Sequence, residues 1–444
     1  LTDAEKLADR ALKVNPKHAA ALRLKADVLA VGESYAAAEK LLLAAKAVNP
    51  RDPHTLGRLA AVYRLQRRPE FEGVVKEAEA SDTKPGIFYA TLAHALEDRK
   101  RFADAETFYR KAGGFRPMVA MPQTGLGMLQ IRLGFDKEGR DILTKAFDAD
   151  PFNVRVSNTL KVLKHLDKYE TVSTPHYELR FDPTTDKVLG AFIEEYLEEV
   201  HADLKKQYGF EPAGRTRADV FSTHEMFSGR IVGVPDLHTV GACTGKIFAM
   251  ASPTAKGLSR PFNWARVLRH ELTHVFNLAQ SDFVCPHWLT EGLAVRNEKM
   301  TRPLSWYKGL RDRADAGTLL DLDTVMLGFV RPRTPDEWQL AYCQSNIYVE
   351  YLVKAHGEGA IQKLLEAYRG GADTATAIQT ACGVDKATFE AGYRKYVDEL
   401  LKPFRTGGKP PAPEKAMTFD ELVTAQKNDP ADADLNARLA EQQM

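Results

Sequence analysis

Two histidines and a glutamate form the pattern in this sequence that most clearly predicts chemistry. His270, Glu271 and His274 lie in the run 264–279, which has no glycine or proline and carries apolar residues at three- to four-residue steps, as a helix does. Residues four positions apart share a helix face, so His270 and His274 can present two imidazole nitrogens to one metal ion. Glu271 can then reach a water on that ion. This H-E-x-x-H arrangement suits Zn²⁺.

A third metal ligand is expected elsewhere in the chain, because catalytic zinc normally has three protein ligands and a water. Glu291 is the best candidate: it follows His274 by 17 positions, within the sequence Trp-Leu-Thr-Glu-Gly-Leu-Ala. That distance allows the first helix to end near Asp282 and a second helix to return Glu291 to the metal. We therefore expect one zinc ion held by two imidazoles and one carboxylate.

The two motifs together resemble those of the gluzincin zinc metallopeptidases, whose second motif reads W-L-x-E-G-x-A. The similarity is to the catalytic core of the gluzincin aminopeptidases and covers about residues 170–400. It implies a peptidase MA-like domain in which His270, His274 and Glu291 bind zinc. It also implies that Glu271 is the general base for hydrolysis of a peptide bond.

The same resemblance suggests a role for Tyr342, in the run 341–352 that we expect to be helical. Several gluzincins have a tyrosine here that donates a hydrogen bond to the oxyanion of the tetrahedral intermediate, although Gln344 and Ser345 replace their usual Lys and Gly. The alternative is that Tyr342 is a half-buried helix residue. Tyr348 is the second candidate for the role, but its place deeper in the helix favours a core position.

Two residues near Glu291 have more than one interpretation. Glu298 lies seven positions later, on the same expected helix face. It either accepts the free N–H of a ligand histidine and fixes its tautomer, or is a solvent-exposed glutamate beside Lys299. His287, which adjoins the loop to Glu291, is interpreted as a structural or capping residue rather than a ligand.

A small sheet is expected before the metal-binding helix, with strands predicted at 176–181, 217–221 and 245–250 and a helix at 186–208. In gluzincins an edge strand lies along the cleft, where a substrate can add itself by main-chain hydrogen bonds. We assign the substrate edge strand to Gly241–Gly245.

This edge also bears on the kind of peptidase. In the gluzincin aminopeptidases the corresponding stretch has a glutamate that holds the free amino terminus of the substrate. The sequence Gly-Ala-Cys-Thr-Gly at 241–245 has no acidic residue. This departure favours internal cleavage, although a carboxylate from another loop would restore exopeptidase action.

The first part of the chain carries a 34-residue repeat. Asn15-Pro16 and Asn49-Pro50 lie 34 positions apart, and apolar residues between them are spaced for a pair of interlocking helices. The repeats resemble the tetratricopeptide repeat, which stacks into a solenoid. The match is weak at 52–85, where Pro69 and Glu72 replace packing residues. Such a solenoid either binds a protein partner or only supports the enzyme, and the sequence leaves both open.

Four segments follow from these patterns. We expect a tetratricopeptide-repeat solenoid at 1–167, a gluzincin-like metallopeptidase domain at 168–403, a Gly/Pro linker at 404–416 and the start of a second helical repeat region at 417–444. The expected fold class is mostly α with a small mixed sheet, an α-solenoid followed by an α+β zincin-type domain.

Composition excludes some partners. With 61 basic and 60 acidic residues the net charge is +1, so we expect no binding to nucleic acid. No apolar run is long enough to predict a transmembrane segment. The four cysteines form no C-x-x-C pair, and free thiols are favoured over disulfides. The chain begins with leucine, which suggests a missing native N-terminus, so both a cytoplasmic and an exported (periplasmic) location remain open.

Two functions from different classes fit the sequence. The first is a zinc endopeptidase whose repeats bind or position a protein or peptide substrate. The alternative is a non-catalytic protein-interaction scaffold with a metal-binding but inactive peptidase fold. The general base and all three metal ligands are present, which favours the enzyme.

Overall fold

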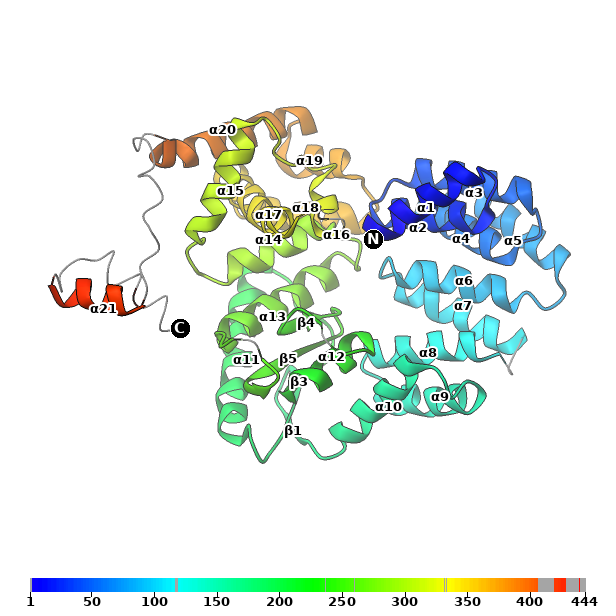
Figure 1. Cartoon of the computed structure of the whole chain (residues 1–444), viewed down its shortest axis with the longest axis horizontal. Coiled ribbons are helices and arrows are strands. Elements are labelled where there is room, and N and C mark those ends of the chain that lie inside the picture. The colour runs from blue at the N-terminus through cyan, green and yellow to red at the C-terminus, as the bar shows by residue number, and fades with distance from the viewer. Residues whose placement is uncertain are drawn as a thin grey trace. The chain divides into compact units, whose positions relative to one another are not determined.

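The computed structural model describes residues 2–115, 119–235, 237–258, 260–330, 332, 334–405, 419–428 and 439. The chain divides into two compact units, Leu1–Lys395 and Tyr396–Met444. The helices of the described residues, labelled in Figure 1, are α1 (Thr2–Val14), α2 (Ala19–Val31), α3 (Tyr35–Val48), α4 (Pro53–Leu65), α5 (Glu70–Ser81), α6 (Gly86–Glu97), α7 (Phe102–Phe115), α8 (Ala120–Arg132), α9 (Asp136–Ala149), α10 (Val154–Leu166), α11 (Lys187–Tyr208), α12 (His224–Val232), α13 (Trp264–Gln280), α14 (His287–Asn297), α15 (Leu304–Asp315), α16 (Val325–Val330), α17 (Pro335–His356), α18 (Gly359–Arg369), α19 (Thr374–Cys382), α20 (Lys386–Arg405) and α21 (Phe419–Asn428). The strands are β1 (Glu170–Ser173), β2 (Tyr177–Phe181), β3 (Thr216–Thr223), β4 (Gly241–Cys243) and β5 (Ile247–Lys256).

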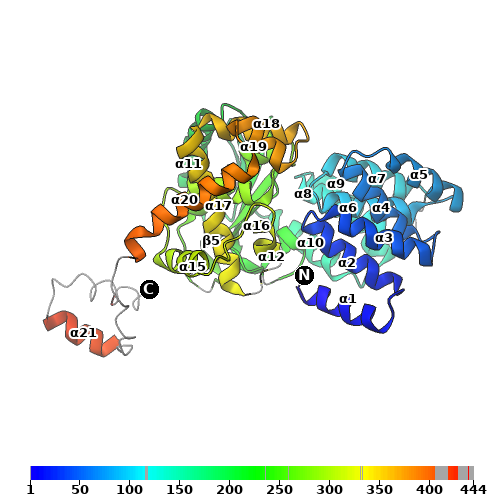
Figure 2. The same cartoon turned by 90° about the horizontal axis from the view of Figure 1, so that it is seen from above.

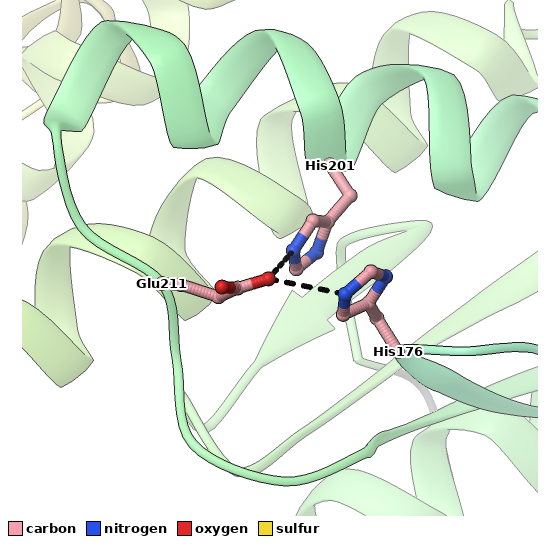
Figure 3. A group of neighbouring side chains, drawn as sticks. All are labelled: His176, His201 and Glu211. Atoms are coloured by element: carbon pink, nitrogen blue, oxygen red, sulfur yellow. Dashed lines mark hydrogen bonds and ion pairs between the residues drawn. The ribbon is translucent and has the colours of Figure 1, made fainter.

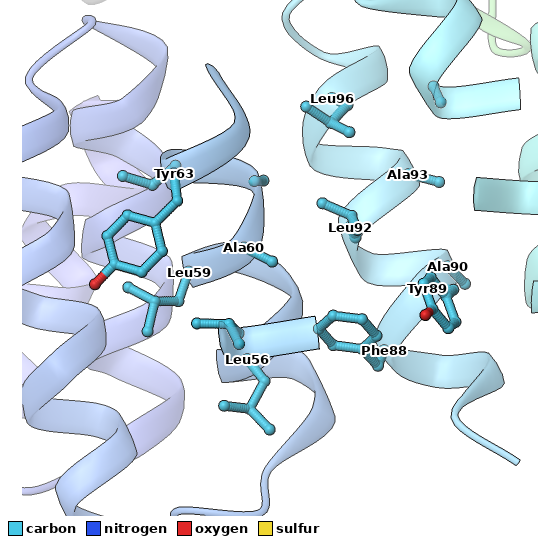
Figure 4. Packing of buried hydrophobic residues seen from close by; sticks show 14 of the residues in the cluster. Leu56, Leu59, Ala60, Tyr63, Phe88, Tyr89, Ala90, Leu92, Ala93 and Leu96 are labelled. Atoms are coloured by element: carbon cyan, nitrogen blue, oxygen red, sulfur yellow. The ribbon is translucent and has the colours of Figure 1, made fainter. Parts of the chain in front are cut away.

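The N-terminal region is built of helix pairs. Each of the pairs α2/α3, α4/α5, α6/α7 and α8/α9 packs together, and successive pairs lie side by side (Figures 1 and 2). Buried alanines such as Ala38, Ala60 and Ala93 let the helices approach closely, and larger residues fill the space between them. Figure 4 shows this core around α4 and α6. The region is therefore a layered helical array, whose assignment as tetratricopeptide repeats stays a prediction.

The segment with the weak repeat pattern forms the same kind of helix pair. Pro69 is the N-cap of α5, a place where proline costs little because the first backbone N–H groups of a helix have no partner within it. Phe71, Val74 and Ala78 then supply the buried face of α5. The unusual residues therefore change how α5 begins and leave its packing intact.

A mixed sheet follows the helical region, in the strand order β1-β2-β3-β5-β4. The three central strands β2, β3 and β5 are parallel, while β1 and β4 pair antiparallel at the two edges. We did not predict β1, because four residues are too few to show an alternating pattern, whereas β4 lies within the stretch 241–245 that we assigned to the edge strand. The expectation of a mostly helical chain with a small mixed sheet is confirmed.

Helices α11 and α13 pack against the sheet and against each other, and α13 contacts both β4 and β5. Helices α10 and α12 pack on the sheet around Phe221 and Ala249. The helix that carries the H-E-x-x-H motif is thus fixed on one side by the edge strand β4 and on another by α11.

A buried ion-pair network joins the helical region to the sheet. Asp219 on β3 accepts hydrogen bonds from Arg180 at 2.6 and 2.7 Å and from Arg230 at 3.0 Å. Both arginines also pair with Asp136 at 2.8 Å, and Asp136 begins α9. Arg217 of β3 adds a bond to the Gly134 carbonyl. Because each buried charge has an opposite partner, the network fixes α9 against the sheet.

Several other expectations can be compared with the structure. The four cysteines are free thiols, as favoured. In the part of the chain that the structure describes, no helix is long and apolar enough to cross a membrane. Most of the linker expected at 404–416 lies outside the described residues, and of the expected second repeat region α21 and residue 439 are described.

Candidate metal centre

Helix α13 presents the H-E-x-x-H residues. Asn263 caps its first turn by accepting a hydrogen bond from the backbone N–H of Arg266 at 3.1 Å. The helix is almost entirely buried on the side that carries Glu271 and His274. His270 and His274 lie one turn apart, and their Nε2 atoms are 3.2 Å from each other.

Helix α14 brings Glu291 to the same point, as the sequence predicted. The carboxylate lies 3.5 Å from Nε2 of His270 and 3.7 Å from Nε2 of His274. Gly292 explains why this helix can lie so deep: a side chain there would collide with the backbone carbonyl of Ser345 on α17. The glycine of the W-L-x-E-G motif therefore allows α14 and α17 to meet closely beside the ligands.

Glu298 at the end of α14 orients His270. Its Oε1 lies 2.8 Å from Nδ1 of His270, and its Oε2 accepts a hydrogen bond from Arg266 at 2.5 Å. A carboxylate can only accept, so Nδ1 of His270 carries a proton and Nε2 is the nitrogen left to bind a metal ion. Of the two interpretations of Glu298, the structure has the contact with a histidine and not free exposure to solvent.

His274 is oriented by two residues that we did not predict. Its Nδ1 lies 2.7 Å from the hydroxyl of Thr290, which donates its own proton to Oδ1 of Asn277 at 2.7 Å. Thr290 must therefore accept from Nδ1–H, which leaves a lone pair on Nε2 of His274. The sequence held a signal for both: Thr290 precedes Glu291 in the second motif, and Asn277 follows His274 by three positions on α13.

The donor set fits a divalent cation. The ligand atoms of His270, His274 and Glu291 all lie within 4.8 Å of one another. The two Nε2 atoms face each other at 3.2 Å, a separation that one shared proton or, in its place, one metal ion would satisfy. Oε2 of Glu291 is buried and accepts no hydrogen bond from any described residue. Two imidazoles and one carboxylate are the ligand set of catalytic zinc sites.

The electrostatics of the site also favour a bound cation. Burial disfavours charge on His270, but Glu291 and Glu298 outweigh it and raise its pKa to about 10. Burial would raise the pKa of Glu291, but the neighbouring histidines hold it well below its usual range. The pocket therefore attracts positive charge, which is supplied by a proton or, more effectively, by a metal ion.

Glu271 lies beside the ligands and against the sheet edge. Burial raises the pKa of its carboxyl to about 7, a value suited to a general base. Gly241 of β4 packs directly on it. Gly241 is in the edge strand as expected, but Gly245 lies after it in a turn with a positive φ of 84°, so the assignment of Gly245 to the strand was wrong.

Tyr342 lies near the carboxylates of the candidate metal centre, whereas Tyr348 lies near Glu390 in the core. Burial, followed by the charges of Glu291, Glu271 and Glu298, raises the pKa of Tyr342. Its hydroxyl makes no hydrogen bond with any described residue. Tyr348 is fully buried and donates to Glu390 at 2.8 Å, which agrees with its expected core position.

His287 is closer to the site than its sequence position suggested. It opens α14, and its Nε2 lies 3.6 Å from Oε1 of Glu291, one helical turn later. Its ring also meets Phe329, which in turn contacts Tyr342. The interpretation of His287 as only a structural residue was incomplete, because i and i+4 spacing already placed it on the face of Glu291.

A cavity of about 830 Å³ opens beside His287. One wall comes from α14 and the loop before it, including Cys285 and His287. The opposite wall comes from turns between helices of the N-terminal region, including Arg67 and Lys100. The described residues thus form a space that is lined by turns of the helical array and by the start of α14, which carries Glu291 one turn later.

Comparison with known proteins adds one match. Residues 248–399 match the family model of the Peptidase MA superfamily. This span includes all but the first residue of β5 and the whole of α13, α14 and α17, and therefore every candidate ligand, but it begins after the edge strand β4. No curated protein matches the chain. The part of the chain that brings His270, His274 and Glu291 together is a peptidase MA-like domain.

Proposed function

We propose that this protein is a zinc-dependent metallopeptidase that hydrolyses internal peptide bonds of a protein or peptide. The observation that carries the proposal is the convergence of two Nε2 atoms and an unbonded carboxylate oxygen on one point, with Glu271 beside it. The family match gives a peptidase MA-like domain. The gluzincin assignment, the zinc ion and the activity go beyond that match.

His270, His274 and Glu291 would hold the ion, which as a Lewis acid would polarise the substrate carbonyl and acidify a water. Glu271 takes the proton of the attacking water and passes it to the leaving amine. Its pKa of about 7 suits both directions of transfer. Tyr342 donates its hydroxyl to the developing oxyanion, since it has no other described hydrogen-bond partner.

Strand β4 suits a substrate that binds in extended form. It pairs with β5 alone among the described strands and lies at the sheet edge next to Glu271. Main-chain hydrogen bonds to such an edge hold a peptide without regard to its side chains. Ala242 and Cys243 supply no charge for a free amino terminus, which supports internal cleavage.

We further propose that the helical pairs act as tetratricopeptide repeats that position the substrate. The 830 Å³ cavity supports this, because turns of the helical region and the loop before α14 line it together. A protein bound by the repeats would then enter the cleft from this side. A role in binding a separate protein partner uses the same surface.

The decisive experiment compares the parent with Glu271→Gln. Zinc is measured by mass spectrometry on protein purified without chelator, and cleavage is measured on a quenched peptide library. We expect equal zinc content in both proteins, at least one ion per chain, and a loss of turnover in Glu271→Gln of about 10³-fold or more. Glu366→Gln, on the exposed side of α18, is the matched control and should cleave normally.

Each other outcome has a clear meaning. Near-normal turnover in Glu271→Gln would remove the residue from its role as base. Zinc binding with no cleavage of any peptide or of a partner captured by the repeats would favour the non-catalytic scaffold. A parent protein that takes up no zinc after reconstitution would contradict the metal centre itself.

A further inference from the structure

A second group of two histidines and a glutamate shares no residue with the candidate metal centre. His176 precedes β2, His201 lies on α11, and Glu211 lies in the loop after α11. Figure 3 shows both imidazoles turned toward one carboxylate: Oε1 of Glu211 is 3.1 Å from Nε2 of His176 and 3.3 Å from Nε2 of His201. The two rings are stacked, with centroids 3.8 Å apart and an angle of 14° between their planes.

The tautomer of His176 follows from Glu198. Oε2 of Glu198 lies 2.6 Å from Nδ1 of His176, while Oε1 accepts the backbone N–H of the same residue at 3.1 Å. A carboxylate only accepts, so Nδ1 of His176 is protonated. Nε2 of the same ring faces an anionic oxygen of Glu211 at 3.1 Å, a contact that either a proton or a metal ion on Nε2 would satisfy.

His201 can offer the same kind of donor. It is almost fully buried, and its Nδ1 lies 2.8 Å from the hydroxyl of Tyr177. That hydroxyl can accept from Nδ1–H, which leaves the Nε2 lone pair directed at Glu211. The ligand atoms of His176, His201 and Glu211 lie within 4.8 Å of one another.

We propose that His176, His201 and Glu211 bind a zinc ion. Imidazole nitrogen and carboxylate oxygen are common zinc ligands. Glu198 plays the part of the carboxylate that fixes a ligand histidine in its metal-binding tautomer. The side chains of His176 and Glu211 are about one-third exposed, 34% and 36%, so the ion has a path from solvent and room for a water as fourth ligand.

Lys205 is the competing cation. Its Nζ lies 2.7 Å from Oε2 of Glu211. Its side chain is 54% exposed, so zinc binding moves the ammonium into water at little cost. Zinc would interact with Oε1 of Glu211 and with both histidines, and the lysine contacts none of these in the described structure. We therefore expect zinc to bind the cluster in the presence of Lys205.

The position of this site indicates a structural role. A zinc ion there would connect the residue before β2, helix α11 and the loop after it. The ring of His201 also contacts Phe276 of α13 in an edge-to-face arrangement, with centroids 5.0 Å apart. A zinc ion at this site would therefore stabilise the packing of α11 against the H-E-x-x-H helix α13, and would take no part in the proposed hydrolysis.

The test separates the two sites by removing one of them. In full-length His270→Gln/His274→Gln, stripped with chelator, added micromolar zinc should still bind at one ion per chain by mass spectrometry and raise the thermal unfolding midpoint. Adding Glu211→Gln or His176→Gln to that background should weaken zinc binding about tenfold or more and remove the thermal shift. Glu195→Gln, exposed on the same helix, should change neither.

Circular dichroism and the unfolding midpoint of the stripped proteins show whether each variant folds. A folded double variant that binds no zinc would overturn the proposal, since the cluster would then be held by a protonated His176 between Glu198 and Glu211. Unchanged zinc binding after Glu211→Gln would overturn it as well. Neither result depends on peptidase activity.

Discussion

Glu271 rests directly on the backbone of Gly241. A Cβ atom on Gly241 would lie 2.7 Å from Oε1 of Glu271 and 2.6 Å from Cγ1 of Val267. Real Cβ atoms do not approach other atoms so closely, so only glycine allows the edge strand to lie this near the H-E-x-x-H helix. The relationship fixes the proposed general base and the proposed substrate edge with respect to each other.

Gly241→Ala should therefore disturb the proposed base. The new methyl group must push Glu271 or β4 aside, and a displacement of this size costs about 10- to 100-fold in kcat. Zinc content should not change, because Gly241 contacts no ligand. Gly309→Ala is the matched control: nothing lies within 4 Å of its Cβ position, and its turnover should equal that of the parent. A Gly241→Ala enzyme with parental kcat would contradict the close contact.

Thr290→Val tests the orientation of His274. Valine has nearly the shape of threonine but cannot accept the Nδ1–H of His274 or donate to Asn277. We expect zinc affinity to fall by about 10- to 100-fold, as is usual when a partner of a ligand histidine is lost. Thr290→Ser, which keeps the hydroxyl, should retain most of the affinity. Competition with a zinc-binding dye measures both, and equal losses in the two variants would contradict the role of the hydroxyl.

Tyr342→Phe and Tyr348→Phe should behave differently. Loss of an oxyanion donor at Tyr342 should lower kcat by about 10²-fold with little change in KM or zinc content. Tyr348 donates to Glu390 inside the core, so its phenylalanine variant should lose about 1–3 kcal/mol of unfolding free energy and keep its kcat. Kinetics and urea unfolding of both variants separate the roles. A reversed pattern would make Tyr348 the catalytic tyrosine.

The sequence was sufficient for the parts of the site that depend on local geometry. Helical i and i+4 spacing placed His270 and His274 together, and the motif on the next helix identified Glu291. The contact between Glu298 and His270 is one of the two interpretations that the position of Glu298 on the face of Glu291 left open. These contacts were accessible from the sequence because each lies within one helix or between two consecutive helices.

Contacts between distant elements were not predictable in the same way. Gly241 meets Glu271 only because β4 pairs at the outer edge of β5, and no pattern in the sequence fixes that order of strands. His176, His201 and Glu211 meet because α11 returns along the start of β2. Pairings of this kind are set by tertiary packing, which a single sequence does not display.

Asp219→Asn should lower stability in a pH-dependent way. Burial would raise the pKa of Asp219, but Arg180 and Arg230 outweigh it and lower the pKa. Its stabilising contribution is thus fully present above the unfolded pKa of about 3.9 and is lost as the pH falls from there through the lower folded pKa. At pH 7 the variant should lose about 3–5 kcal/mol of unfolding free energy, because two buried arginines each lose one of their two anionic partners.

Urea unfolding of parent and Asp219→Asn from pH 7 down to pH 3 checks this expectation. The difference between the two should be constant above about pH 5 and should narrow at lower pH, as the parent loses its own ion pairs. The exposed Asp148→Asn variant on α9 should unfold like the parent. A difference that does not vary with pH would mean that the charge of Asp219 is not what stabilises the fold.

Lys100 provides a test of whether the helical region takes part in substrate binding. It lines the cavity together with His287. Burial lowers the pKa of His287; the charge of Glu291 opposes this shift, and the positive charge of Lys100 adds to it. If a substrate occupies the cavity, Lys100→Ala should raise KM about 3- to 10-fold for peptides with an acidic residue or a terminal carboxylate there, with kcat unchanged.

Lys17→Ala, in an exposed turn of the same helical region that does not line the cavity, should leave KM unchanged. Equal KM values for Lys100→Ala and the parent with every acidic peptide would place the substrate outside this cavity and leave the repeats without a part in its recognition.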